Sequence, residues 1–340
     1  MTNKLVTIVS DQTIPNVLLI KELGSNIQCY IFLTTEAMEK KIKRTAIIDT
    51  CEIPEEKIVT INISEDKSSG IKKTLYDHSL GLEANAHYHV NITGGTKMMS
   101  LAVYEYFRNL NSTFYYLPIG KNVLSKFKTQ FDEQIVALEN RLTLHEYLLA
   151  CGISYNFKEK FFFTEENCFE IFRDYKINDF IFEKFPVETA EKMSAYSVKP
   201  DNIRGIWFEE FVFYYLKKKL KLPDKMIACS VKVFKDMDVQ YNDNEFDVMY
   251  VKDNELNVIE CKVQMGANPS QKLDGILYKL GAINKNFGLK TNSFIYTLSD
   301  LQNKWGNYSP VLLRKCEVMN IKPPFDKTFF KKIINPNKKI

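Results

Sequence analysis

The N-terminal part of the chain alternates between short apolar runs and stretches typical of helices. Apolar runs of five to seven residues, a length typical of buried strands, occupy residues 5–9, 27–33, 58–63, 87–92 and 113–117. The predicted helices lie between them, at residues 17–23, 35–43, 71–80 and 98–107. A chain in which strands alternate with helices forms a parallel sheet with helices on its faces. The pattern therefore predicts a doubly wound, Rossmann-like α/β domain.

Two polar segments follow strands of this predicted sheet. One is the loop at residues 10–16, and the other is a short turn at residues 93–97 that leads into a helix. Loops at the carboxyl ends of parallel strands line the ligand crevice, and a helix N-terminus offers amide groups and a positive dipole to an anion. The candidate ligand-binding residues of the two segments are Ser10, Asp11, Gln12, Asn16, Thr93, Gly94, Gly95, Thr96 and Lys97.

The turn at residues 93–97 also has a purely structural interpretation. Thr93 or Thr96 can cap the following helix, in which case the glycines only permit a tight turn. The spacing of Gly94, Gly95 and Lys97 differs from that of a nucleoside-triphosphate P-loop, so that kind of site is not predicted.

The C-terminal part contains a predicted hairpin with charged side chains. Apolar runs at residues 244–251 and 256–262 flank a polar turn. Side chains alternate faces along a strand, so Glu260 and Lys262 point to one face and Cys261 to the other. Asp247, on the first strand of the hairpin, supplies a second carboxylate. Gln264 continues the same alternation beyond Lys262, so its side chain is a further candidate for this face.

These hairpin residues suit metal-assisted phosphate chemistry. Two carboxylates bind a hard divalent cation such as Mg²⁺ or Mn²⁺ through oxygen. A lysine beside them can hold an attacking water or stabilise charge on a phosphate. The alternative is a surface hairpin on which Glu260 and Lys262 form only a weak ion pair.

The Asp247, Glu260-x-Lys262 arrangement resembles the active-site pattern of the PD-(D/E)xK nucleases, although Phe246 stands where that pattern has a proline. This fold usually carries a glutamate on its first helix, which the resemblance assigns to Glu209, with the adjacent Glu210 as a rival. The resemblance implies that Glu209, Asp247 and Glu260 hold Mg²⁺ or Mn²⁺ and that Lys262 orients the attacking water.

The segment between the two regions is rich in phenylalanine and acidic residues. It begins with a predicted helix at residues 142–152, and its aromatic side chains are either a core or a base-stacking platform, of which we favour the core. After the hairpin, a helix is predicted at residues 271–286. Lys272 and Lys279 share one face of this helix, where they contact either phosphates or solvent.

Composition narrows the class of protein without deciding it. The 340 residues carry a net charge of +4, but residues 201–340 have a net charge of +7 and residues 1–200 a net charge of −3. A basic C-terminal half is compatible with a nucleic-acid partner. The seven scattered cysteines predict a reducing cytoplasm and no zinc site. We find no transmembrane run and no signal peptide, so no membrane association is expected.

The order of these features along the chain resembles that of the CARF-domain nucleases of type III CRISPR systems. The resemblance implies a CARF domain at residues 1–139, a connecting segment at residues 140–200 and a PD-(D/E)xK domain at residues 201–340. It further implies a homodimer that binds a cyclic oligoadenylate, with cyclic tetra-adenylate expected, and then cuts nucleic acid. The ring phosphates would contact Lys97 and the amides of Gly94 and Gly95, with the residues of the first loop opposite.

The sequence leaves other functions and the substrate open. A restriction or repair nuclease of related fold would cut without an activator, and a ligand-sensing regulator would carry a silent nuclease domain. Because this chemistry acts on the backbone, little base preference is expected, and single-stranded DNA, RNA and plasmid DNA are all candidate substrates.

Overall fold

The computed structural model describes residues 2–78, 83, 85–128, 132–234, 244–266, 269–283, 287–288 and 291–333. They divide into two compact units, one within residues 1–153 and 288–290 and the other within residues 154–287 and 291–340. None of the helices in these described stretches is both long and apolar enough to cross a membrane. All seven cysteines carry free thiols.

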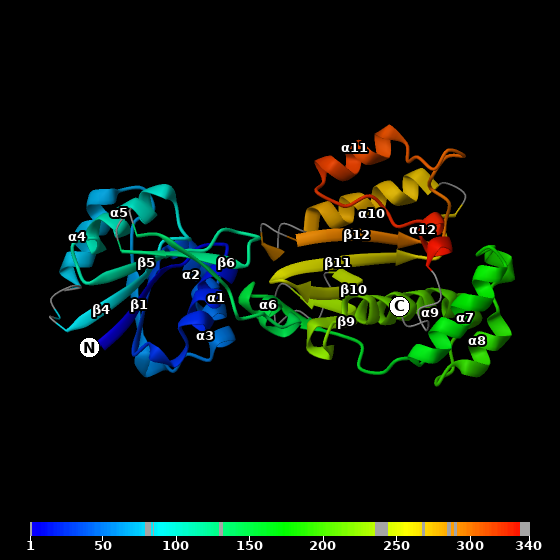
Figure 1. Ribbon diagram of the computed structural model, residues 1–340, viewed down its shortest axis with the longest axis horizontal. Helices are drawn as coiled ribbons and strands as arrows, with labels where there is room; N and C mark the ends of the chain where they lie inside the picture. The colour runs from blue at the N-terminus through cyan, green and yellow to red at the C-terminus, as the bar shows by residue number, and fades with distance from the viewer. Residues whose placement is uncertain are drawn as a thin grey trace. The chain divides into compact units, whose positions relative to one another are not determined.

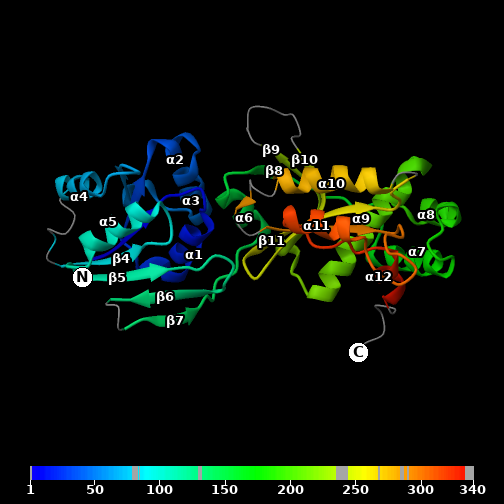
Figure 2. The same ribbon diagram turned by 90° about the horizontal axis from the view of Figure 1, so that it is seen from above.

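A seven-stranded sheet forms the first unit, with the strand order β3-β2-β1-β4-β5-β6-β7 (Figure 1). Strands β1 to β5 are parallel, which confirms the doubly wound prediction. The β6–β7 hairpin adds two antiparallel strands beside β5 (Figure 2) and was not predicted, because β7 is exposed along its whole length and has no apolar alternation. The strands are β1 Thr2–Ile8, β2 Cys29–Thr34, β3 Ile58–Asn62, β4 Ala86–Asn91, β5 Ser112–Tyr116, β6 Val123–Phe127 and β7 Gln134–Ala137.

Helices cover both faces of this sheet (Figure 1). α4 and α5 pack together over the face that carries Val6, Val90 and Phe114, while α1, α3 and α6 pack against one another. The helix predicted at residues 35–43 is interrupted, because Ile42 has a left-handed φ of 51°. The helices are α1 Ile14–Leu23, α2 Glu36–Lys40, α3 Lys43–Cys51, α4 Ser68–Asp77, α5 Lys97–Phe107 and α6 Leu144–Ala150, with 3₁₀ turns η1 Gly24–Asn26 and η2 Glu55–Lys57. Residues 79 and 80 of the fourth predicted helix lie outside the described residues.

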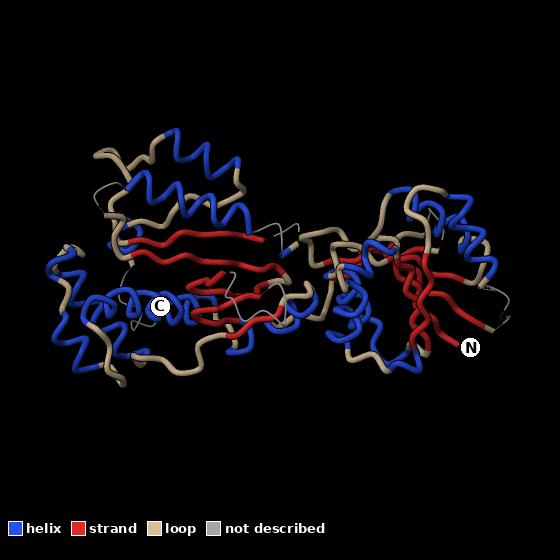
Figure 3. Tube along the Cα trace, turned by 180° about the vertical axis from the view of Figure 1, so that it is seen from behind, coloured by secondary structure: helices blue, strands red, loops and turns tan. Residues whose placement is uncertain are grey.

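The second unit is built on a five-stranded sheet of order β12-β11-β10-β9-β8, with helices on both sides (Figure 3). Only β11 and β12 are parallel. The strands are β8 Ser154–Asn156, β9 Ile227–Phe234, β10 Asn244–Lys252, β11 Glu255–Lys262 and β12 Thr291–Thr297. The helices are α7 Glu165–Ile177, α8 Val187–Met193, α9 Pro200–Leu220, α10 Pro269–Ile283, α11 Pro310–Val318 and α12 Lys327–Lys332, with 3₁₀ turns η3 Phe182–Lys184 and η4 Asp224–Met226.

The segment expected to connect the domains is divided between the two units. Helix α6 belongs to the first unit, and residues from Ser154 onward belong to the second. Phe157 and Tyr196 of this segment are about half-exposed, but the aromatic side chains from Phe163 to Phe185 are mostly buried beside α9, where Phe172 stacks on Phe211 at a centroid distance of 4.3 Å. They therefore form a core, as favoured, because a buried ring cannot stack on a nucleic-acid base. Helix α9 begins at Pro200, where the sequence predicts the start of the nuclease domain.

Helix α10 carries the apolar stripe that its sequence predicts. Leu273, Ile276, Leu277 and Leu280 are all buried, so the helix packs on the second unit through this face. Residues 284–286, which the prediction included in the helix, lie outside the described residues.

Candidate active site and ligand pocket

The β10–β11 hairpin brings the predicted catalytic residues together. Its turn residues Asp253 and Asn254 have φ values of 53° and 59°, the left-handed pair that a tight hairpin with right-handed twist requires. In this register Val248 pairs with Ile259, so Asp247 and Glu260, which come next on each strand, lie at the same level. Both carboxylates are buried, at 9% and 5% exposure.

Lys262 lies against both carboxylates, as the alternation of the strand predicts. Its Nζ is 2.8 Å from Glu260 Oε1 and 3.7 Å from Asp247 Oδ2. The amide of Cys261 donates a hydrogen bond of 2.6 Å to Asp247 Oδ2, while the Cys261 side chain packs in the core of the other face. The hairpin therefore holds an Asp–Glu–Lys cluster whose side chains share one face.

Burial and the close approach of like charges shift the pKa values of this cluster. Burial, and next the neighbouring Glu260, raise the pKa of Asp247 to about 6. Burial alone would lower the pKa of Lys262, but Asp247 and Glu260 outweigh it, so the pKa of Lys262 is raised. The lysine therefore stays charged. The two carboxylates lie close together, so a bound cation would reduce the repulsion between them.

The structure gives the two adjacent glutamates of α9 different surroundings. Glu210 is completely buried and accepts hydrogen bonds from the amides of Phe162 at 2.9 Å and Phe163 at 2.8 Å, while Lys158 Nζ lies 2.6 Å away. Glu210 is thus an anchor for the loop before α7. Burial, and next the charge of Asp247, raise the pKa of Glu209 to about 8. Glu209, the better match in sequence, is the one that is electrostatically coupled to the hairpin.

A second lysine contacts the cluster from α10. Lys279 Nζ is 3.1 Å from Glu260 Oε2 and 3.0 Å from the carbonyl of Glu245. Lys272, one of the two lysines on the predicted face, donates to the carbonyl of Gln264 at 3.2 Å. Gln264 itself is exposed and lies beyond the end of β11, so the strand alternation that suggested it for the site ends before it.

The donor set of this cluster fits a hard divalent cation. Glu209, Asp247 and Glu260 offer only carboxylate oxygens, the donors that Mg²⁺ and Mn²⁺ prefer. In the described part of the chain no three acidic, histidine or cysteine side chains are already gathered at metal-binding distance. At Glu260 the reason is visible, since Lys262 and Lys279 each contact one of its oxygens.

The first unit contains a pocket where the two predicted polar loops meet. Its volume is about 430 Å³, and its lining residues are Val9, Ser10, Asp11, Gln12, Pro15, Thr35, Met38, Glu65, Thr93, Gly94, Gly95, Thr96, Met99 and Ile119. A Cβ at Gly94 would lie 2.6 Å from the carbonyl oxygen of Ile8, and Gly95 has a φ of +79°. Both positions therefore require glycine so that the turn can close against the end of β1.

Two of the predicted ligand residues do not line this pocket. Asn16 is buried and donates to Thr7 Oγ1 at 2.7 Å and to the carbonyl of Ile8 at 2.9 Å, so it supports the end of β1 instead. Lys97 is exposed at the first position of α5. Thr96 caps α5 by accepting the amide of Met99 at 3.2 Å, which was the structural alternative for the turn.

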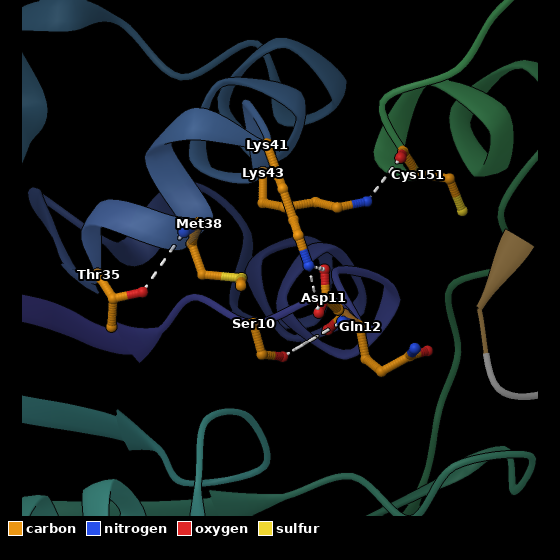
Figure 4. Close-up of polar contacts among 8 residues, drawn as sticks. All are labelled: Ser10, Asp11, Gln12, Thr35, Met38, Lys41, Lys43 and Cys151. Carbon is orange, nitrogen blue, oxygen red and sulfur yellow. Dashed lines mark hydrogen bonds and ion pairs between the residues drawn. The ribbon is translucent and has the colours of Figure 1, made fainter. Parts of the chain in front are cut away.

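The sequence prediction missed a cation beside the pocket. Lys41 Nζ contacts both carboxylate oxygens of Asp11 at 2.9 Å (Figure 4). Nearby, Lys43 donates to the carbonyl of Cys151 at 2.9 Å and so joins α3 to the end of α6. Thr35, which lines the pocket, could have been recognised as a helix cap from the Thr-Glu sequence at the start of α2. No local sequence pattern pairs Lys41 with Asp11.

The fold and the two sites define a class of protein, a Rossmann-like ligand domain joined to a domain with a nuclease-type Asp–Glu–Lys cluster. Residues 4–147 match the family described as Card1 CARF domain. Residues 200–307 match the family described as Card1-like, endonuclease domain. The chain therefore combines a Card1-type CARF domain with a Card1-like endonuclease domain, the pair of domains that the sequence resemblance implies.

Solved structures of low sequence identity share the fold of this chain. Protein VC1899 from Vibrio cholerae has a TM-score of 0.74 and 14% identity, over 97% of this chain and 95% of that protein. Can2 from Sulfobacillus thermosulfidooxidans, in complex with cyclic tetra-adenylate, has a TM-score of 0.70 and 17% identity, over 97% and 96%. A type III CRISPR defence DNA nuclease activated by cyclic oligoadenylate has a TM-score of 0.59 and 15% identity, over 94% of this chain and 52% of its own. No curated protein sequence matches the chain.

Proposed function

We propose that this chain is a cytoplasmic, homodimeric, metal-dependent nuclease that a cyclic oligoadenylate activates in type III CRISPR defence. The observation that carries the proposal is the buried Asp247–Glu260–Lys262 cluster in an endonuclease-family domain that follows a CARF-family domain. Cyclic tetra-adenylate is the proposed activator, because Can2, which shares the fold over most of both chains, was solved with that ring. DNA and RNA both remain candidate substrates.

In the proposed mechanism, Glu209, Asp247 and Glu260 hold Mg²⁺ or Mn²⁺. When bound, that cation stabilises negative charge on the phosphate and makes a water easier to deprotonate. Lys262 stays protonated because Asp247 and Glu260 raise its pKa. Its ammonium orients the attacking water or stabilises the charge that builds up on the phosphate. The chemistry acts on the phosphate backbone rather than on the bases, so we expect little base preference.

One assay tests the proposal as a whole. The full chain is incubated with Mg²⁺ or Mn²⁺ and with labelled RNA, labelled single-stranded DNA or plasmid DNA, with and without each cyclic oligoadenylate. We expect little cutting without a ring and strong cutting with cyclic tetra-adenylate, because an activator must bind the active arrangement more tightly than the resting one. Full activity without any ring would favour the ungated restriction or repair nuclease. Ring binding without cutting of any substrate would favour the regulator.

The pocket of the first unit is the proposed activator site. Ser10 and Gln12 lie in one of its walls, and residues 93–96 of the turn form another, with Lys97 outside the lining. Ring phosphates would contact the amides of Gly94 and Gly95 and the charge of Lys97 at the start of α5. Asp11 brings a carboxylate into the same pocket, and its contact with Lys41 offsets the repulsion that this carboxylate would exert on a phosphate.

The Lys41→Met variant is expected to need about two- to fivefold more activator for half-maximal cutting, a modest effect because the Lys41 and Asp11 side chains are about half-exposed and solvent screens their charges. Loss of the ammonium leaves Asp11 uncompensated, while the nuclease cluster is untouched, so the rate at saturating activator should not change. Titration of cyclic tetra-adenylate against cleavage measures both quantities. The matched control is Lys40→Met, because Lys40 pairs with Glu36 on the surface, 2.7 Å away.

Lys97→Ala in the same titration tests the lysine of the turn, and a curve superimposable on wild type would remove it from the site.

A ring with repeating phosphates is suited to a pair of pockets related by a two-fold axis. We therefore expect a homodimer that binds one ring, with two copies of the turn at residues 93–97 contributing to the site. Light scattering with and without cyclic tetra-adenylate measures the mass, and calorimetry measures the stoichiometry. A monomer under both conditions, or one ring bound by each chain, would contradict this arrangement.

A further inference from the structure

Lys279 is held at the nuclease cluster by the packing of α10. Its helical neighbours Leu277 and Leu280 are completely buried, so the backbone at this position is fixed against the core. The side chain is about one-third exposed, at 34%, and its ammonium reaches Glu260. Lys279 is therefore anchored at its base and reaches both the cluster and solvent with its charged end.

Two of the three N–H groups of the Lys279 ammonium have acceptors in the described part of the chain. One is Glu260 Oε2 at 3.1 Å and the other is the Glu245 carbonyl at 3.0 Å. The ammonium also lies 5.7 Å from the centre of the Phe246 ring. Lys262 occupies the other oxygen of Glu260, at 2.8 Å. Glu260, whose side chain is 7% exposed, thus has one lysine on each carboxylate oxygen.

This arrangement conflicts with metal binding. A divalent cation at Glu260 needs at least one of these oxygens, and it repels both ammonium groups at short range. Lys262 is on the same strand as Glu260 and is also attracted by Asp247, 3.7 Å away, so it has little freedom to leave. Lys279 comes from a separate helix and is about one-third exposed, so rotation of its side chain can carry the ammonium outward without any backbone movement.

We propose that Lys279 is the counter-ion of Glu260 in the metal-free site, that it gives up this place to the metal, and that its ammonium then binds a backbone phosphate of the nucleic acid. The inference rests on the proposed nuclease function. It assigns Lys279 two states, each of which places the ammonium beside a negative oxygen. The exchange also couples metal binding to nucleic-acid binding, because the substrate phosphate pairs with the ammonium that the metal displaces from Glu260.

A purely structural role for Lys279 makes the opposite prediction for metal binding. If Lys279 only held Glu260 in position, its loss would misplace the carboxylate and weaken the metal site. If Lys279 competes with the metal, its loss removes a competitor and a repulsive charge, and the metal binds more tightly. The sign of the change in metal affinity therefore separates the two roles, and it is measured without any nucleic acid.

The first measurement is calorimetric titration of the full chain with Mn²⁺ alone. We expect Lys279→Met to bind Mn²⁺ about tenfold more tightly than wild type, the equivalent of one charge-assisted hydrogen bond. Lys279→Gln serves as a second variant if the methionine variant does not fold. Lys272→Met is the matched control, because it removes a lysine from the same face of α10 that donates to the carbonyl of Gln264 and not to Glu260, and it should leave the affinity unchanged. Weaker or unaltered Mn²⁺ binding by the Lys279 variants would overturn the proposal.

The second measurement addresses the phosphate contact. With cyclic tetra-adenylate saturating, Lys279→Met should raise KM for the nucleic acid about tenfold, and the slope of log KM against log salt should fall by about one, the loss of one phosphate contact. Lys279→Arg should restore both, because it keeps the charge. An unchanged salt slope would refute the phosphate role.

Glu260→Gln in the Mn²⁺ titration separates this inference from the proposed function. If wild type binds Mn²⁺ and Glu260→Gln does not, the metal site stands and the Lys279 variants test the exchange. If Glu260→Gln binds Mn²⁺ as wild type does, the proposed metal site is wrong, and the inference that rests on it falls too.

Discussion

Replacement of Glu260 by glutamine is expected to reduce nucleic-acid cleavage by roughly a thousandfold or more, in line with the removal of a preorganised charge from an active site. Glutamine keeps the shape of the side chain but supplies one neutral oxygen where the proposed metal site needs a carboxylate. Asp247→Asn should have a comparable effect, because the two carboxylates lie at the same level of the hairpin. Lys262→Met should also abolish cutting, since it removes the ammonium that contacts both of them.

The measurement is cleavage of labelled nucleic acid at saturating cyclic tetra-adenylate, with activator binding measured in parallel. Glu255→Gln is the matched control, because Glu255 begins the same strand and contacts Asn292 at 3.1 Å, at the opposite end from the cluster. Activator affinity should stay at the wild-type value in every variant, since the pocket belongs to the other unit. Cleavage at a near-normal rate by Glu260→Gln would remove the hairpin from the active site.

Replacement of Glu210 by alanine is expected to destabilise the second unit by about 3–5 kcal/mol, the usual cost of removing one partner of a buried ion pair. The change leaves the amides of Phe162 and Phe163 without their acceptor and Lys158 without its carboxylate. Thermal or denaturant unfolding of the full chain measures the loss. If the variant has the same unfolding midpoint as wild type, the loop before α7 does not depend on this anchor.

Glu209→Gln, one position earlier on α9, should behave in the opposite way. Cutting should be lost because the helix carboxylate is removed, but the fold should not be weakened. The pKa of Glu209 is raised to about 8 from an ordinary value of 4.5, so ionisation of this carboxyl opposes folding. Wild type should lose stability relative to the variant as the pH rises from about 4.5 to 8, and the two should converge near pH 4, where Glu209 is protonated in both folded and unfolded chains. Unfolding midpoints across this pH range measure the difference, and parallel profiles would contradict it.

Local sequence patterns were sufficient to predict the features that depend on residues close together along the chain. The alternation of side chains in a strand placed Glu260 and Lys262 on one face and Cys261 on the other. Gly94 and Gly95 indicated a tight turn from a strand into a helix, and the turn lines a pocket together with the first loop. Strand β7 escaped prediction because a strand without a buried face has no hydrophobic period to recognise, and β6, which buries the adjacent residues Leu124 and Ser125, has no regular alternation either.

The chain alone determined that an Asp–Glu–Lys hairpin follows a Rossmann-like domain with two polar loops, because hydrophobic period and turn chemistry act over a few residues. Only the tertiary structure showed which of two adjacent glutamates faces the hairpin and which residues distant in sequence form ion pairs. Successive helical residues point about 100° apart, so the packing of α9 buries Glu210 against the loop before α7, while the charge of Asp247 acts on Glu209 and helps to raise its pKa. The pairing of Lys279 with Glu260, and of Lys41 with Asp11, joins residues of separate elements. Such contacts follow from how whole elements pack, and no local pattern of residues records them.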